Sequence, residues 1–418
     1  MGISQTQSIT DNRWRRTLYI IFIAQLVTAI GFSSIFPFLP LYVESLGTKT
    51  ALSVEWLAGL VYSAQAFTMM IASPVWGALA DRYGRKLMVE RAMFGGSIIL
   101  LMMAFVQTAE QLVVLRAIQG LVTGTIAAAS ALVAASVPRE RMGYSMGLLQ
   151  VALGAGVALG PLIGGSIADI YDYNYTFYVT SALLFSAGLM VWLGVDEYFE
   201  PNQKLSGSWG SFVLEWRQIL SAPGIVTTYS MRFITQLGRM MIVPIAPLFI
   251  QTLLVNSTRL NTFTGLVVGA ASASATISAV YLGRLGDRIG HRRILITCTL
   301  AAGILYLPQS LVTAGWQLLI LQASVGIALG GIIPAISALL AHYTRSGEEG
   351  AVYGLDNSIN AGSRALAPLL GAAIGYLIGL RATFVVTAIF FLFASMLATW
   401  SLPKIETSVP DSCANAEK

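Results

Sequence analysis

The sequence is poor in charge, histidine and cysteine. Of its 418 residues only 11% are charged and only two are histidines. A soluble domain carries about 25% charged residues, so this composition is too apolar for a surface that faces water. The two cysteines, Cys298 and Cys413, form neither a disulfide framework nor a cluster of metal ligands. We therefore expect a membrane protein without a metal site, a cofactor or enzymatic chemistry.

The sequence is rich in long apolar segments. Hydrophobic residues make up 56% of the chain, and the mean hydropathy is +0.71. A helix that crosses the hydrocarbon core of a bilayer needs about 20 apolar residues. The pattern predicts an all-α membrane protein with twelve transmembrane helices, centred on residues 17–43, 54–79, 87–108, 111–137, 142–170, 174–198, 224–253, 260–282, 293–313, 316–341, 350–379 and 382–402.

The loops predict the orientation. Twelve spans place both termini on one side of the membrane. If that side is the cytoplasm, sixteen basic residues lie in inside segments and three lie outside, namely Lys49, Arg259 and Arg381. This asymmetry follows the positive-inside rule, so we expect both termini to be cytoplasmic. The net charge of +5 then reflects loop topology, and we expect no binding to nucleic acid.

Two charged stretches between apolar segments reveal a duplication. The first is GALADRYGRK at 77–86 and the second is GRLGDRIGHR at 283–292. A displacement of 207 also aligns residues 143–165 with residues 350–372 without a gap. Parallel repeats of six helices are typical of secondary transporters. We predict two pseudo-symmetric six-helix bundles, at 1–198 and 224–402, with a cytoplasmic linker at 199–223 and a cytoplasmic tail at 403–418.

Three motifs in order carry a family resemblance. GALADRYGRK is followed by LVVLRAIQGLVTG at 112–124 and GAGVALGPLIGG at 154–165. Together they resemble the major facilitator superfamily, and within it the twelve-helix drug:proton antiporters of bacterial multidrug efflux. The resemblance implies a proton-coupled exporter of small molecules in the bacterial cytoplasmic membrane, whose partners are the lipid bilayer, protons and the cargo. We expect it to act as a monomer.

The resemblance also assigns two conformational elements. The charged loop and its repeat resemble a latch that stabilises the outward-facing state, made by Gly77, Asp81, Arg82, Gly84, Arg85, Asp287 and Arg288. Gly77 and Gly84 would permit close backbone approach and a tight turn. The glycine-rich segment resembles a helix-packing hinge made by Gly156, Gly160, Pro161 and Gly164. A nucleotide loop is disfavoured there, because its glycine spacing and preceding strand are missing.

Polar residues inside predicted spans mark a candidate cavity, because ionisable groups in a membrane are costly and usually functional. Arg232, Gln236 and Arg239 share one helical face, and Asp356, Asn360 and Arg364 share another. The predicted cavity residues are Gln25, Phe32, Phe36, Arg116, Arg232, Gln236, Arg239, Asn357, Asn360 and Arg364. Surplus guanidinium groups favour anionic or neutral amphiphilic cargo, because arginine binds carboxylate and phosphate bidentately.

Asp356 is the predicted proton-coupling residue, with Arg364 as its expected neighbour. The alternative is that Asp356 only neutralises an arginine. At the level of function, the chain is predicted to export drugs or a self-made metabolite such as a carboxylate siderophore. Import of a nutrient anion on the same scaffold, or a sensor without transport, are the other interpretations.

Overall fold

The fold is helical throughout the part of the chain that the structure describes. This computed structural model describes residues 3–138, 141–197, 224–254, 259–344 and 349–403. The helices are α1 (Ile3–Ile35), α2 (Leu39–Leu46), α3 (Val54–Tyr83), α4 (Arg85–Met103), α5 (Ala109–Val122), α6 (Thr125–Ser136), α7 (Met142–Ile170), α8 (Tyr173–Gly194), α10 (Ile225–Met241), α11 (Ile245–Leu253), α12 (Leu260–Ile289), α13 (His291–Tyr306), α14 (Gly315–Tyr343), α15 (Glu349–Leu377) and α16 (Leu380–Ser401). A short 3-10 turn covers Pro308–Leu311. The predicted all-α class is confirmed.

Within the described residues, ten segments are long and apolar enough to cross a membrane. They are Trp14–Ile35, Val54–Gly77, Ala109–Ala134, Met142–Ile170, Tyr173–Gly194, Ile225–Leu253, Leu260–Ile289, His291–Leu311, Gly315–Tyr343 and Leu380–Ser401. Two further long helices fall short because they are more polar. α4 carries Lys86, Glu90 and Arg91, and α15 carries Asp356 and Arg364.

Three predicted spans are each made of two helices. α1 gives way to α2 around Pro37, and α10 gives way to α11 beside Pro244. Proline interrupts a helix because it has no amide hydrogen and its ring crowds the preceding turn. α5 ends before Gly124, whose φ of +149° is a conformation that side chains oppose. These breaks were not predicted, because hydropathy alone continues across them.

The duplication recurs in the contacts between helices. The Thr180 hydroxyl donates to the carbonyl of Gly31 at 3.3 Å. Thr387 and Gly238, each 207 residues further along, make the same bond at 3.4 Å. The same relation holds for the close approach of Gly164 to Ser34 and of Gly371 to Met241. Matching contacts at matching displacements show that the repeat in sequence is a repeat in packing.

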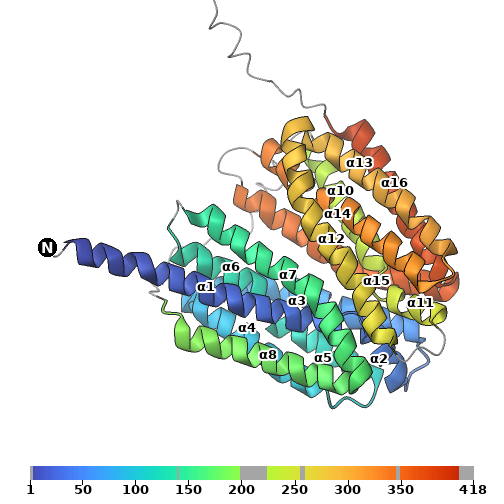
Figure 1. The fold of residues 1–418 in the computed structure, drawn as a ribbon, viewed down its shortest axis with the longest axis horizontal. Helices are drawn as coiled ribbons and strands as arrows, with labels where there is room; N and C mark the ends of the chain where they lie inside the picture. Colours follow the sequence, from blue (N-terminus) through green and yellow to red (C-terminus); the bar gives the residue numbers. More distant parts are fainter. Residues whose placement is uncertain (1–2, 139–140, 198–223, 255–258, 345–348, 404–418) are drawn as a thin grey trace, which may run out of the picture.

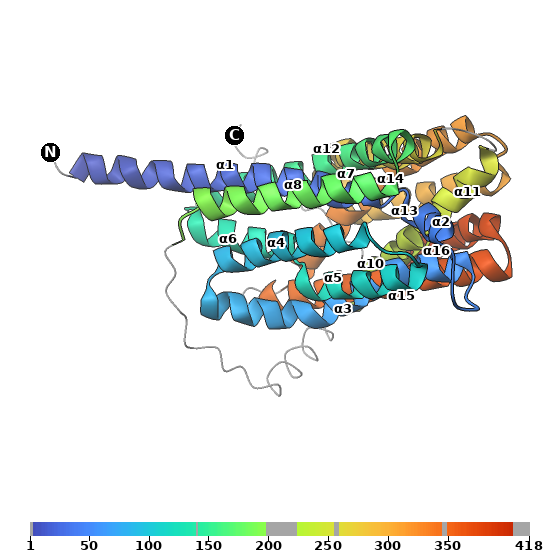
Figure 2. The same ribbon diagram turned by 90° about the horizontal axis from the view of Figure 1, so that it is seen from below.

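The helices run roughly along the long axis of the molecule, as Figures 1 and 2 show. We call the end at which α1 begins the N-terminal end, and the end with α2 and α11 the distal end. In the first half of the chain α1 packs on α7 and α8, and α3 packs on α5. In the second half α12 packs on α14, and α10 packs on α15 and α16. The main contacts between the halves join α7 to α12 and α3 to α15.

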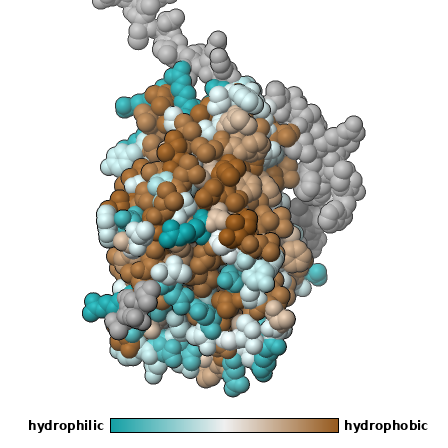
Figure 3. Space-filling model, turned by 90° about the vertical axis from the view of Figure 1, so that its right-hand side faces the viewer, coloured by the Kyte–Doolittle hydropathy of each residue, from teal (hydrophilic) through white to brown (hydrophobic). Residues whose placement is uncertain are grey.

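The outside of the molecule is strongly apolar. Large side chains such as Trp192, Tyr281 and Trp400 are exposed. Figure 3 shows a face on which hydrophobic side chains cover broad areas. Soluble monomers rarely expose apolar patches of such extent. The surface is suited to contact with lipid.

Candidate functional site

The centre of the candidate site is a buried ion pair between α10 and α15. Arg232 Nε donates to Asp356 Oδ1 at 2.8 Å, and Arg232 Nη2 donates to Asp356 Oδ2 at 2.9 Å. Both residues are less than 10% exposed. Arg232 Nη2 also donates to the hydroxyl of Ser337 on α14 at 3.2 Å. The pair is therefore bidentate and connects α10, α14 and α15.

The expected neighbour of Asp356 was wrong. The sequence indicated Arg364, but the ion-pair partner is Arg232. Arg364 lies eight residues along the same helix, which corresponds to about 12 Å of helical rise. A residue on a facing helix reaches the carboxylate more easily than one displaced by two turns.

Two more arginines lie near this pair without acidic partners. Arg239 and Arg364 interact electrostatically as like charges, although they lie on α10 and α15. Neither has an ion-pair partner among the described residues. The Arg364 side chain is exposed, although it lies in the middle of α15 within electrostatic range of Arg239. A small cavity beside the pair is lined by Arg232, Thr235, Gln236, Arg239, Leu329, Ile332 and Ile333.

Arg116 forms a separate cluster in the first half of the chain. It is 2% exposed, and its Nη1 donates to Gln119 Oε1 at 2.7 Å. Its guanidinium carbon lies 5.8 Å from the ring centres of both Phe36 and Tyr62. Its Nε and Nη2 atoms have no hydrogen-bond partner among the described residues. Aromatic faces stabilise a cation, but they do not replace these missing acceptors.

Tyr62 and Gln119 were not predicted as members of this cluster. The Tyr62 hydroxyl donates to the Phe36 carbonyl at 2.7 Å, and the two rings stack at 5.5 Å. Gln119 stands three residues after Arg116 on the same helix, a spacing that places side chains together. That signal was present in the sequence. Tyr62 lies on α3, and nothing in its local sequence points to Arg116.

The remaining predicted cavity residues fall into different surroundings. Gln25 is 1% exposed, and its Oε1 has no partner among the described residues. Phe32 packs toward Gly96 on α4 rather than beside Phe36. Asn357 is exposed and Asn360 is half-buried on α15. The structure therefore unites Arg232, Asp356, Gln236 and Arg239, and it keeps Arg116 and Phe36 in a second cluster.

The glycines of the predicted latch differ from one another. Gly84 separates α3 from α4 with φ +102°, and its repeat Gly290 separates α12 from α13 with φ +96°. Both positions use a conformation that favours glycine, as expected for a tight turn. Gly77 differs, because a Cβ added there would meet no described atom within 4 Å. The close approach expected at Gly77 is therefore not seen among the described residues, and its place in the latch stays a prediction.

The charged members of the latch make contacts close by in sequence. The Asp81 side chain lies outside the described part of the chain. Arg82 is exposed over the ring of Tyr83, and Asp287 pairs with His291 one turn further along at 3.1 Å. Of the two remaining arginines, Arg85 is half-buried and Arg288 is exposed.

The strongest contacts of these loops fasten each one to the last helix of its own half. Lys86 Nζ donates to the Trp192 carbonyl at 3.0 Å near the end of α8. Its repeat Arg292 donates to the Thr399 carbonyl at 2.6 Å near the end of α16. Cations at the carbonyl end of a helix are favourable. Glu197 accepts from the backbone amides of Arg85 and Lys86 at 3.0 and 2.7 Å, at the start of α4.

The predicted hinge glycines bring α7 against α1. Added Cβ atoms at Gly156, Gly160 and Gly164 would meet backbone atoms of α1. The Ser33 hydroxyl donates to the Gly156 carbonyl at 2.7 Å. Close contact of small residues is typical of membrane helix pairs. These glycines thus join two helices of the same half.

The carbonyl of Pro161 contacts the opposite half of the molecule. Its carbonyl lies against Gly265 of α12, so it takes part in the contact between the halves. The repeat of Pro161 is Pro368, whose carbonyl would lie 2.8 Å from a Cβ added at Gly59 of α3. The two proline carbonyls therefore meet glycines of the opposite half in equivalent ways.

A carboxylate closes the distal end between the halves. Asp169, at the end of α7, accepts from the Asn261 amide, the Asn261 side chain and the Thr262 amide at 3.0, 2.8 and 2.6 Å. Both acceptor oxygens thus sit on the first turn of α12, where a negative charge is favourable. Sequence reasoning missed Asp169, because an acid at the end of a span normally indicates a solvated residue.

A helical membrane protein with an internal repeat and a buried ion pair between its helices has the features of a secondary transporter. The chain belongs to the Major Facilitator Superfamily, whose family model matches residues 21–251 and 228–412. This confirms the resemblance found in the sequence. Its relatives include the Multidrug resistance protein MdtG of Serratia proteamaculans (strain 568), which is 36% identical over 97% of this chain and 98% of that protein.

Solved structures share the fold at much lower identity. The human organic anion transporter MFSD10 (TETRAN) is 18% identical, with a TM-score of 0.66 over 92% of this chain and 99% of that one. A bacterial homologue of the human lysosomal transporter Spinster, in an inward-facing and unoccupied conformation, is 13% identical. Its TM-score is 0.76 over 92% of this chain and 96% of that one.

Proposed function

We propose that this protein is a secondary active exporter that exchanges protons for small amphiphilic molecules, with anionic or neutral drugs and metabolites favoured. The observation that carries the proposal is the buried Arg232–Asp356 pair beside the unpaired Arg239 and Arg364. The MdtG relatives support export, because their name states multidrug resistance. The surplus of guanidinium groups supports anionic or neutral cargo over cations.

The proposed architecture is twelve membrane helices in two pseudo-symmetric bundles. The ten apolar segments and the more polar α4 and α15 give this number. The repeated contacts of Thr180 and Thr387 support the pseudo-symmetry. The domains are 1–198 and 224–402, with the linker at 199–223 and the tail at 403–418. The positive-inside bias supports an orientation with the N-terminal end in the cytoplasm and the distal end outside.

With that orientation the structure corresponds to an inward-facing state. The contacts of Asp169 with α12 and of Gly59 with α15 hold the halves together near the distal end. The likeness to an inward-facing Spinster homologue supports this assignment. Cargo would enter the cavity from the cytoplasm or inner leaflet, and opening of the distal contacts would release it outside.

Proton coupling is proposed to act through the bidentate pair. Protonation of Asp356 removes its charge and breaks the bond that joins α15 to α10, so the two protonation states favour different cavity shapes. Cargo would bind the deprotonated, joined state. Protonation also raises the positive charge of the cavity by one, which by itself favours binding of an anion together with a proton. Antiport therefore requires that the change of shape outweigh this electrostatic term.

The test is transport by the purified protein in liposomes under imposed pH gradients. Asp356→Asn is expected to lose at least ten-fold of gradient-driven transport of a fluorescent amphiphile while downhill exchange continues. Asp172→Asn, at an exposed acid outside both the pair and the predicted latch, is the matched control. Unchanged gradient-driven transport in Asp356→Asn would remove this residue from coupling. Accumulation of the amphiphile on the side to which protons flow, rather than on the side from which they come, would indicate the anion importer instead.

A further inference from the structure

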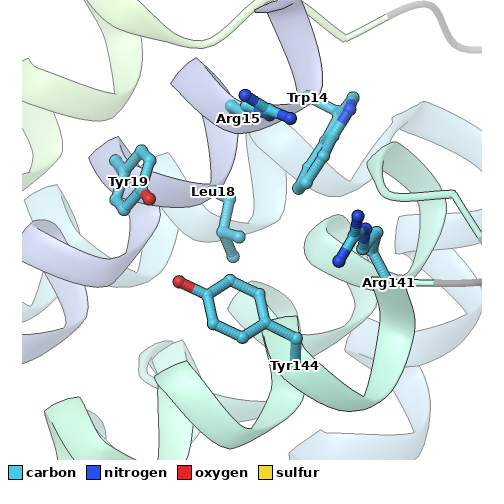
Figure 4. A pocket seen from close by; sticks show the side chains of 6 residues that line it. All are labelled: Trp14, Arg15, Leu18, Tyr19, Arg141 and Tyr144. Atoms are coloured by element: carbon cyan, nitrogen blue, oxygen red, sulfur yellow. The ribbon is translucent and has the colours of Figure 1, made fainter. Parts of the chain in front are cut away.

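A pocket of about 200 Å³ lies between α1 and α7 at the N-terminal end. Figure 4 shows Trp14, Arg15, Leu18 and Tyr19 of α1 facing Tyr144 of α7 and Arg141, which directly precedes α7. Among the described residues, the lining combines two arginines and three aromatic rings with one leucine. It is remote in sequence from the Arg232–Asp356 pair, and nothing in the proposed transport mechanism uses it.

The pocket lies at the boundary of the apolar part of both helices. Trp14 and Arg15 come shortly before the apolar run that begins at Leu18, and Arg141 directly precedes α7. Aromatic and basic side chains concentrate at the depth of lipid headgroups. The lining residues thus have the composition expected of a headgroup layer on the cytoplasmic side.

Apolar surface continues from the pocket along both helices. Ile23 stands one turn after Tyr19 on α1 and is 43% exposed. Val151 stands two turns after Tyr144 on α7 and is 58% exposed. Residues at these spacings share a helical face. A molecule with a charged head in the pocket would therefore find apolar surface for a tail directly beside it.

We propose that this pocket binds the phosphate headgroup of an anionic phospholipid, with an acyl chain along Ile23 and Val151. Guanidinium groups of Arg15 and Arg141 match phosphate oxygens in geometry and charge. The hydroxyls of Tyr19 and Tyr144, which both line the pocket, offer further donors to the headgroup. Drug-sized ligands occupy pockets of about 300–1,000 Å³, so this volume suits a phosphate and glycerol better than a cargo molecule.

The site does not depend on the position of the two halves relative to each other. Both of its walls belong to the first half, and α1 and α7 pack closely along their length. Lipid binding can therefore be measured without transport. Its failure would leave the proposed export function untouched, and failure of transport would leave the lipid site untouched.

The test is native mass spectrometry of the full-length protein with phosphatidylglycerol or phosphatidylcholine at equal concentration. The wild type is expected to retain phosphatidylglycerol preferentially. Arg15→Gln/Arg141→Gln is expected to lower that retention at least five-fold, whereas Arg16→Gln/Arg293→Gln removes the same charge from exposed positions outside the pocket and retains it. Size-exclusion profiles check that both glutamine variants are folded. If Arg15→Gln/Arg141→Gln does not fold, Arg15→Lys/Arg141→Lys replaces it, because that variant keeps both charges.

Two results would overturn the proposal. Equal loss of phosphatidylglycerol from both glutamine variants would mean that diffuse positive charge, not the pocket, attracts the lipid. Displacement of the lipid by glycerol phosphate at equal concentration would mean that a soluble phosphate ester, not a lipid, is the ligand. Retention by the lysine variant together with loss from the pocket glutamine variant would support the lipid site.

Discussion

At the scale of single residues, the protein buries charged side chains between its helices. Asp356 and Arg232 satisfy each other through two hydrogen bonds, and Ser337 adds a third. Arg116 relies on one amide and two aromatic rings, and two of its nitrogen atoms have no acceptor among the described residues. A buried pair is tolerated because each charge compensates the other, and removal of one partner leaves a buried charge alone.

Removal of one member of the Arg232–Asp356 pair should cost more stability than removal of both. Asp356→Asn or Arg232→Gln is expected to destabilise the folded state by about 3–5 kcal/mol, because a buried charge loses its counter-ion. Arg232→Gln/Asp356→Asn should recover most of that loss. Thermal unfolding in detergent measures the three variants, and additive losses in the double variant would contradict a coupled pair.

The Arg116 cluster gives a second residue-scale prediction. Arg116→Lys keeps the charge but removes the planar group that bonds Gln119 and faces both rings. Lysine does not reproduce bidentate contacts, so binding of a carboxylate-bearing amphiphile should weaken by about ten-fold. Equilibrium binding to the purified protein measures this. Lys86→Arg, at the N-terminal end of α4, serves as a charge-conserving control, and equal binding by both variants would exclude Arg116 from cargo contact.

At the scale of helices, the packing depends on glycines at chosen positions. Gly164 of α7 lies against the backbone of α1, while Gly147 of the same helix has no atoms within 4 Å of an added Cβ. The sequence presents both as glycines in one apolar segment. Only the neighbouring helix distinguishes a required glycine from a tolerant one.

Gly164→Leu should therefore destabilise the protein, while Gly147→Leu should not. Forcing extra atoms into a filled contact costs about 1–3 kcal/mol or more, because the helices must move apart. Gly147→Leu places the same side chain in open space on the same helix. Thermal unfolding of both variants tests the prediction, which would be wrong if the two lost equal stability.

At the scale of the whole molecule, contacts between the halves are made near the distal end. Asp169 bonds three groups at the start of α12. The repeat offers no equivalent, because the position 207 residues after Asp169 is Tyr376, whose side chain is exposed. The hydrogen bonds of Asp169 therefore have no counterpart at the equivalent position of the repeat, although the helix packing is two-fold. A hydrogen bond to a charged group contributes about 1.5–3 kcal/mol, so three of them bias a two-state equilibrium strongly.

Asp169→Ala should shift the population toward a state that is open at the distal end. Spin labels on the half-buried Ser166 of α7 and the exposed Leu266 of α12 should report a longer distance. The fraction of molecules with that longer distance should rise about ten-fold. Asp172→Ala is the control, because that carboxylate bonds only the adjacent Tyr173 amide. An unchanged distance distribution in Asp169→Ala would show that Asp169 does not close the distal end.

Much of the architecture could be predicted from the sequence because it depends on local composition. The apolar segments, the charged loops and the displacement of about 207 residues are visible without coordinates, and they lead to the correct superfamily. The turn glycines Gly84 and Gly290 were also predictable, since the chain must reverse between two apolar segments there. The breaks at Pro37 and Gly124 were missed, because they do not interrupt the apolar pattern.

The sequence by itself determined which residues carry charge into the membrane, because burial of an arginine or an aspartate in an apolar segment is costly wherever it occurs. Only the tertiary structure decided their partners. It paired Asp356 with Arg232 instead of Arg364, set Tyr62 against Arg116, and placed Asp169 on the first turn of α12. These contacts join helices that are distant in the chain, and their geometry depends on how the helices pack against one another.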